Sequence, residues 1–118
     1  MTRHDDRITL RQMRDHITEA ESFLRGRSRE DLETDRLLFL ALLKTVEIVG
    51  EAATRVSETV RNGHPEIPWQ DIIDTRHRLI HGYDTVDNDI LWHIVTSDFR
   101  DVDVGLRSVL DALSPEGR

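Results

Sequence analysis

Apolar and polar residues alternate along most of the chain with the period of a helix that buries one face. The first such segment, residues 5–25, ends at Gly26. Ser28 to Asp31 and then Thr34-Asp35 offer two helix starts. We therefore expect one helix, a short helical turn and a second, long helix. The apolar positions of the first helix are Leu10, Met13, Ile17, Ala20 and Leu24.

The long helix is expected to run from Asp35 to Arg61, where Asn62-Gly63-His64-Pro65 stops it. Residues 37–43 are apolar nearly all round, which predicts neighbours on more than one side of this helix. Gly50 costs a helix about 1 kcal/mol relative to alanine, and a close helix crossing is its simplest explanation. The positions that keep the helical period are Leu38, Ala41, Leu42, Val46, Val49, Ala52, Ala53, Val56 and Val60.

Pro68 is placed to open a further helix that would carry the chain to Gly82. A last helix follows, with one apolar stripe formed by Leu91, Val95, Phe99, Val102, Leu106, Val109 and Leu113. The pattern contains no strand and no internal repeat. We predict an all-α fold, an antiparallel bundle of four to five helices in one domain that spans residues 1–118.

Composition limits the classes of function. The chain has no cysteine, which excludes a disulfide framework and a thiolate nucleophile. It shows neither a secretory signal nor an apolar run long enough to span a membrane, so a cytoplasmic protein is expected. The net charge of −7 and the pI near 5.3 disfavour a protein that coats nucleic acid through a broad basic surface. An enzyme with a local positive site remains compatible with them.

The candidate chemistry lies between Arg76 and Tyr83, in the sequence Arg-His-Arg-Leu-Ile-His-Gly-Tyr. Histidine exchanges protons near neutral pH, and guanidinium binds phosphate oxygens. On one straight helix, His77 and His81 would share a face, but Arg76 and His81 would be about 140° apart. Arg76 and His81 could still converge if Gly82 lets the backbone leave the helix at His81, or if a second protomer supplies the complementary group.

Each of these residues also has a purely structural interpretation. His81 could cap a helix, and Arg76 and Arg78 could form surface ion pairs with Asp71 or Asp74. Tyr83 could be a packed aromatic. A metal site is disfavoured, because the two histidines enclose Arg-Leu-Ile without the glutamate of a zinc-binding helix. We therefore expect neither a metal nor a cofactor.

Three segments together resemble the HepT family of HEPN-domain proteins. They are Ile48-Val49-Gly50-Glu51-Ala52-Ala53, then Ile67-Pro68-Trp69, then Arg76-x4-His81-Gly82-Tyr83, and they occur in the family's order. The Arg-x4-His spacing alone is common by chance, whereas the combination is specific. The chain departs from the family's commonest choice at His77, where asparagine is usual.

The resemblance implies a HEPN fold and a toxin of a HEPN/MNT toxin–antitoxin pair, a metal-independent endoribonuclease that acts as a homodimer. Arg76 would bind and polarise the scissile phosphate, and His81 would be the acid or base. His77, together with Arg78, would be an auxiliary polar or phosphate contact. The partner antitoxin would be a small nucleotidyltransferase that attaches AMP to Tyr83, in a type VII-like system.

The chemistry of RNA agrees with that expectation. The neighbouring 2′-OH can act as the nucleophile, so the protein needs a base, an acid and a positive charge. Two motifs across a twofold axis would supply two histidines and two arginines. The alternative is a catalytically silent helical module that serves as partner or substrate-binding domain for a nucleotidyltransferase. Growth arrest on expression of the chain alone separates the two hypotheses.

Overall fold

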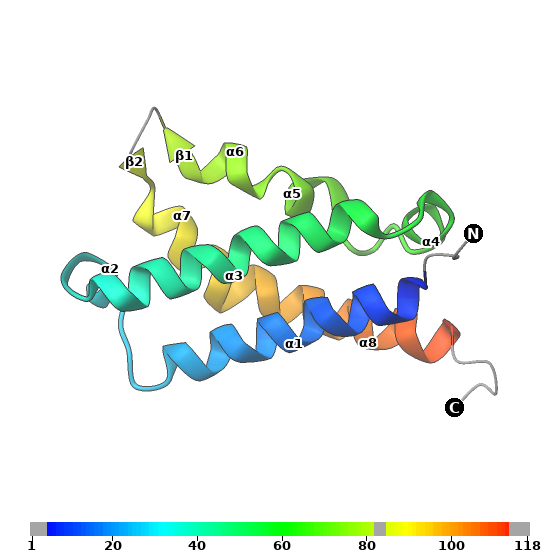
Figure 1. Cartoon of the computed structure of the whole chain (residues 1–118), viewed down its shortest axis with the longest axis horizontal. Coiled ribbons are helices and arrows are strands. Elements are labelled where there is room, and N and C mark those ends of the chain that lie inside the picture. Colours follow the sequence, from blue (N-terminus) through cyan, green and yellow to red (C-terminus); the bar gives the residue numbers. More distant parts are fainter. Residues whose placement is uncertain (1–4, 82–84, 114–118) are drawn as a thin grey trace.

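In the computed structural model the chain is a bundle of helices with one short β ribbon (Figure 1). The structure describes residues 5–81 and 85–113; the side chains of Arg76, Ile80 and His81 lie outside that description. Its elements are α1 (Asp6–Leu24), α2 (Asp31–Thr34), α3 (Arg36–Arg55), α4 (Glu58–Gly63), α5 (Trp69–Ile73), α6 (Thr75–Leu79), β1 (Ile80–His81), β2 (Thr85–Val86), α7 (Asn88–His93) and α8 (Phe99–Leu113). A π-helical turn, Ile94–Asp98, joins α7 to α8 and is called the π-turn below.

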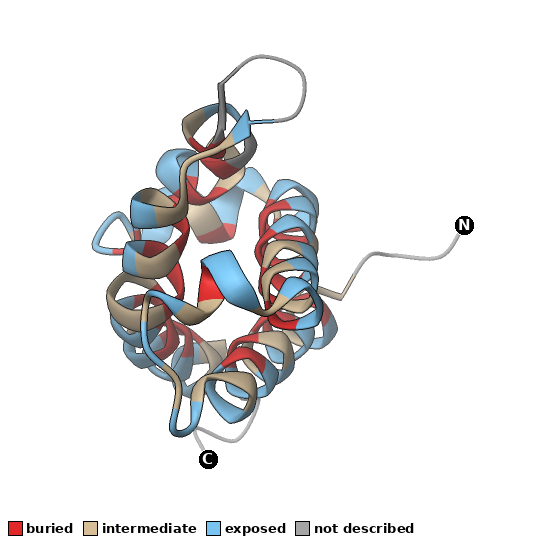
Figure 2. Ribbon diagram, turned by 90° about the vertical axis from the view of Figure 1, so that its left-hand side faces the viewer, coloured by how far each residue is buried: buried red, intermediate tan, exposed pale blue. Residues whose placement is uncertain are grey.

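Buried residues lie on the faces of the helices that point into the bundle (Figure 2), and their apolar side chains form one core. The helix α1 runs antiparallel to α3 and to α8, and the three enclose most of the core (Figure 1). Asp103 of α8 is also buried, and it accepts a hydrogen bond from Arg14 Nε of α1 at 2.8 Å. The prediction of an all-α antiparallel bundle is confirmed. The fully buried side chains include Leu10, Met13, Ile17, Leu42, Leu79, Leu91 and Leu106.

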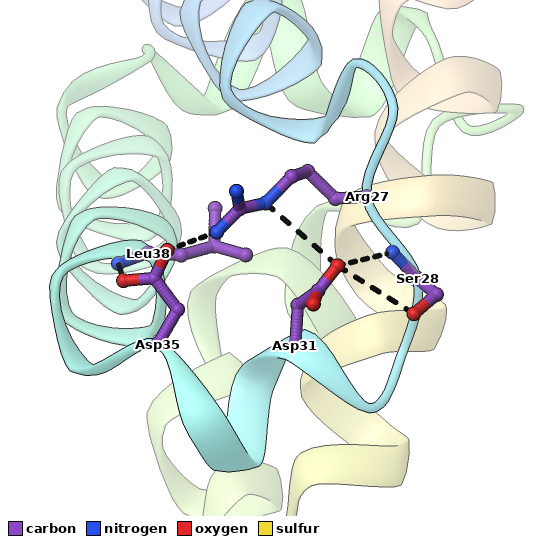
Figure 3. Close-up of polar contacts among 5 residues, drawn as sticks. All are labelled: Arg27, Ser28, Asp31, Asp35 and Leu38. Atoms are coloured by element: carbon purple, nitrogen blue, oxygen red, sulfur yellow. Dashed lines mark hydrogen bonds and ion pairs between the residues drawn. The ribbon is translucent and has the colours of Figure 1, made fainter.

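The helix α1 ends, and α2 and α3 begin, where the sequence predicts. Gly26, with φ +71°, takes the left-handed conformation just after α1. Asp35 caps α3 by accepting the backbone N–H of Leu38 at 3.1 Å (Figure 3). That hydrogen bond, together with an ion pair to Arg27, lowers the pKa of Asp35. Arg27 also lies 3.8 Å from Asp31, so one guanidinium ties the loop after α1 to α2 and α3 (Figure 3).

The long helix is shorter than predicted, because α3 ends at Arg55 and a separate helix α4 begins at Glu58. Ser57 caps α4 by accepting the Val60 N–H at 3.3 Å, which is a stronger start signal than the continuing apolar period. The carboxylate of Asp6 on α1 accepts both the backbone N–H and the hydroxyl of Ser57. A contact remote in sequence therefore fixes the break.

Gly50 lies at a close helix crossing, as predicted. A β-carbon at this position would stand 3.0 Å from the carbonyl oxygen of Ile72 on α5, at the tight limit for such contacts. The expectation that residues 37–43 are covered on several sides holds in part. Leu38 and Leu42 are buried, but Leu37 is 81% exposed and Leu40 is 44% exposed. Among the described residues, none of the helices combines the length and hydropathy needed to cross a bilayer.

The segment after Pro68 differs most from its prediction. Pro68 precedes α5 instead of occupying its first position, and the helix breaks at Asp74 between α5 and α6. The helix then ends at Leu79, and the chain enters β1. The sequence pattern missed this ribbon, in which Ile80 pairs with Val86 and His81 with Thr85 in antiparallel register. Strands of two residues leave no periodic pattern to detect.

Candidate active site

Arg76 and His81 lie on opposite sides of a change in backbone structure. Arg76 belongs to α6, whose first turn forms around Asp74: the Asp74 carbonyl accepts the backbone N–H of His77 at 2.8 Å and of Arg78 at 3.2 Å. His81 belongs to β1 and pairs with Thr85. The separation of about 140° calculated for a straight helix therefore does not apply.

The prediction that His77 and His81 share one helical face is wrong, because α6 ends two residues before His81. Arg76 and His81 were expected to converge either through an exit of the backbone from the helix at His81 or through a second protomer. The backbone does leave the helix before His81. Gly82, expected to permit that exit, lies outside the described residues.

Thr75 and Leu79 anchor α6 to the bundle. Thr75 is buried, and its hydroxyl donates to the carbonyl oxygens of Ile72 at 2.5 Å and Asp71 at 3.0 Å. Leu79 is 1% exposed and packs into the core. Its carbonyl oxygen accepts the Asp87 N–H at 3.0 Å, which is the first bond of the connection to α7. These contacts fix where the helix stops and the ribbon begins.

The next helix supports the ribbon from its other side. Asp87 caps α7 by accepting the backbone N–H groups of Asp89 and Ile90. Arg29, in the loop before α2, lies 2.5 Å from Asp89 and 2.9 Å from Glu33. Hydrogen bonds to Glu33 and Asp89 raise the pKa of Arg29. The helix α7, which follows the ribbon, is thus connected to α2, and the ribbon lies at the end of the molecule opposite α4 (Figure 1).

The structure describes the side chains of some of the remaining candidate residues and not of others. His77 is exposed on α6. Arg78 Nη1 lies 3.6 Å from Asp98 Oδ2, so the guanidinium predicted as a phosphate contact has a carboxylate partner within the chain. Tyr83 lies outside the described residues, as do the side chains of Arg76 and His81. Their roles therefore stay predictions.

Two hollows border α6. The larger, of about 440 Å³, runs between α3 and the α5–α6 segment and includes Gly50, Glu51 and Leu79 in its wall. The smaller, of about 180 Å³, lies where α5 and α6 meet the last helix, beside Arg78 and Asp98. Across residues 5–81 and 85–113, no three histidine, aspartate or glutamate side chains gather as ligands of a metal would.

Sequence reasoning missed Asp98 and His93 as members of this region. His93 Nε2 lies 3.2 Å from Asp98 Oδ1, on the side of Asp98 that Arg78 does not contact. The available signal was two successive steps of four residues in the last apolar stripe, Leu91 to Val95 to Phe99. A regular helix averages 3.6, so this spacing is compatible with an inserted residue but does not require one.

Comparison with known proteins identifies the family. The family model described as "Ribonuclease HepT-like" matches residues 13–109. The chain is 35% identical over 89 residues to the protein of Thermococcus cleftensis named "Probable ribonuclease HepT", covering 75% of this chain and 81% of that one. It is 30% identical over 106 residues to a protein of Caldanaerobacter subterraneus named a "Putative RNase", covering 86% and 95%. No solved structure matches the chain significantly. The chain belongs to the HepT-like ribonuclease family.

Proposed function

We propose that this protein is a metal-independent endoribonuclease, the toxin of a HEPN/MNT toxin–antitoxin pair in the cytoplasm. The observation that carries the proposal is the Arg-x4-His motif at the junction of α6 and β1, inside the segment that matches the ribonuclease family. The break in the helix removes the geometric objection to joint action of Arg76 and His81. The names of the relatives support RNA as the substrate class.

The proposed reaction uses a nucleophile from the RNA itself. One histidine takes the proton of the 2′-OH as that oxygen attacks the adjacent phosphorus, and a second acid protonates the leaving 5′-oxygen. Arg76 stabilises the charge that builds on the phosphate oxygens. The products are a 2′,3′-cyclic phosphate and a 5′-hydroxyl. His77 assists as a polar contact beside Arg76.

A homodimer supplies what one chain lacks. A single motif provides one His81 and one Arg76 in a chain of net charge −7, whereas two facing motifs provide a base, an acid and two guanidinium groups. We expect sedimentation to give about twice the chain mass of 13.7 kDa. In a mixture of His81→Ala and wild-type chains, the activity per wild-type chain should then fall as mixed dimers form, because each mixed dimer lacks one of its two His81 side chains. A fully active monomer would contradict the shared centre.

Metal removal tests the mechanism directly. Because the 2′-OH is the nucleophile and His81 the proposed acid or base, RNA cleavage should continue at an unchanged rate in EDTA. The measurement follows a labelled RNA on a denaturing gel with and without the chelator. A rate that falls in EDTA and returns with zinc or magnesium would replace this mechanism with a metal-dependent one.

Expression of the chain alone tests the biological role. A ribonuclease toxin should arrest growth, and co-expression of its nucleotidyltransferase, attaching AMP to Tyr83, should restore it. The matched control is the same chain with His81→Ala, which should be harmless. Equal growth with both chains would favour the alternative, a non-catalytic partner module of the nucleotidyltransferase.

A further inference from the structure

Asp98 links the motif segment to the last helix of the bundle. Its two carboxylate oxygens face different partners: Oδ2 lies 3.6 Å from Arg78 Nη1 on α6, and Oδ1 lies 3.2 Å from His93 Nε2 on α7. The Asp98 side chain is one-third exposed, at 32%. A single partly buried carboxylate of the π-turn therefore contacts both α6 and α7.

The π-turn creates this arrangement. Phe99 donates its backbone N–H to the carbonyl oxygen of Ile94, five residues earlier. In a regular α-helix, residues five apart point about 140° away from each other, and pairs form at three or four residues. His93 and Asp98 are five apart, so their contact depends on the extra residue in the turn. Such turns are rare in proteins and frequently occur at functional sites.

The helix α6 needs an anchor of this kind. It has five residues, far fewer than an isolated helix needs for stability in water. The ribbon that follows has two paired residues on each strand, which is also marginal alone. The orientation of α6, and with it the backbone from Arg76 to His81, therefore depends on contacts with the rest of the bundle.

The surroundings of Arg78 favour an ion pair that positions α6 over a contact with an RNA phosphate. The residues that line the small cavity beside it include Asp71, Asp98 and Asp101. The Asp98 carboxylate, 3.6 Å from the Arg78 guanidinium, competes with an RNA phosphate for that group.

We propose that Asp98 is a positioning residue of the ribonuclease centre, which acts through Arg78 to hold α6 in its working orientation. This inference rests on the proposed function. Asp98 touches no reacting atom; it sets where the backbone carrying Arg76 and His81 lies. Small displacements of catalytic groups slow a reaction strongly, so loss of the anchor reduces turnover more than RNA binding.

The kinetic test compares Asp98→Asn with Asp101→Asn. Both variants remove one negative charge near the same cavity, but Asp101 is exposed in the first turn of α8. We expect Asp98→Asn to lower kcat on the order of 10-fold with KM for RNA little changed, and Asp101→Asn to leave both constants unchanged. Asp98→Glu should recover part of the loss. A lower KM and a faster reaction in Asp98→Asn would overturn the proposal, because they would show that freed Arg78 binds phosphate.

Backbone amide exchange supplies a readout that needs no activity. Amides of residues 75–81 should exchange faster in Asp98→Asn than in Asp101→Asn, while amides of α1 and α3 stay equal. Equal exchange in residues 75–81 would overturn the proposal. Failure of the proposed function looks different: the wild-type chain would then cleave RNA no faster than His81→Ala, whatever the exchange rates show.

Discussion

Replacing His81 with alanine abolishes RNA cleavage and growth arrest while the helices remain folded; this is the largest expected effect. His81 is the acid or base of the proposed reaction, and such a group typically contributes 10²- to 10⁴-fold to a rate. The backbone of His81 forms the ribbon through pairing with Thr85, and alanine can make the same backbone bonds. Circular dichroism should therefore be unchanged while cleavage of labelled RNA is lost.

A second histidine provides the matched control. His16 lies on α1, 3.3 Å from Glu19 and away from the motif segment. His16→Ala removes the same side chain and should keep the parental cleavage rate. A parental rate in His81→Ala would contradict the mechanism and leave His81 with a structural role. Loss of helical signal in His81→Ala would instead show that the residue is needed for folding.

Local rules predicted the first half of the fold well. The helices α1 and α3 follow apolar stripes that repeat every three or four residues over several turns. Gly26 follows the end of α1 and Asp35 precedes the start of α3, and both act through local contacts. The break after Arg55 could not be predicted in this way. It depends on the Asp6 carboxylate, which is 51 residues from Ser57 in sequence and accepts two of its hydrogen bonds.

The candidate site was predictable in its residue types but not in its geometry. Arg76, His81 and Tyr83 stand out because their chemistry and spacing are read directly from the sequence. The backbone of His81 was mispredicted because the apolar residues Ile72, Leu79 and Ile80 continue a helical pattern across the break. The Thr75 hydroxyl, which binds two carbonyl oxygens of α5, and the pairing of Ile80 with Val86 both depend on the folded state.

The pairing of Asp98 with His93 shows the same limit. Residues five apart on a helix are not expected to meet, and the π-turn that brings them together inserts only one residue. Apolar periodicity tolerates that insertion, since Leu91, Val95 and Phe99 are all buried. A sequence pattern can therefore place the last helix correctly and still miss the contact that connects it to the motif.

Tyr83→Phe should abolish attachment of AMP and leave the toxin active in the presence of its nucleotidyltransferase. Tyr83 is the only tyrosine of the chain and follows His81 by two residues, between the paired positions His81 and Thr85. AMP on its hydroxyl would add a negative phosphodiester and a nucleoside near the place where the RNA phosphate binds. Both charge repulsion and bulk would then oppose the substrate.

Intact-mass measurement after incubation with the nucleotidyltransferase and ATP should show a gain of about 329 Da per AMP for the wild-type chain and none for Tyr83→Phe. His81→Ala serves as the control, because it keeps the tyrosine and should still gain AMP while inactive. Phenylalanine removes only the hydroxyl, so Tyr83→Phe should cleave RNA before incubation as the wild-type chain does. A Phe variant that still gains AMP and is still silenced would place the modified residue elsewhere and leave Tyr83 a role in packing or substrate contact.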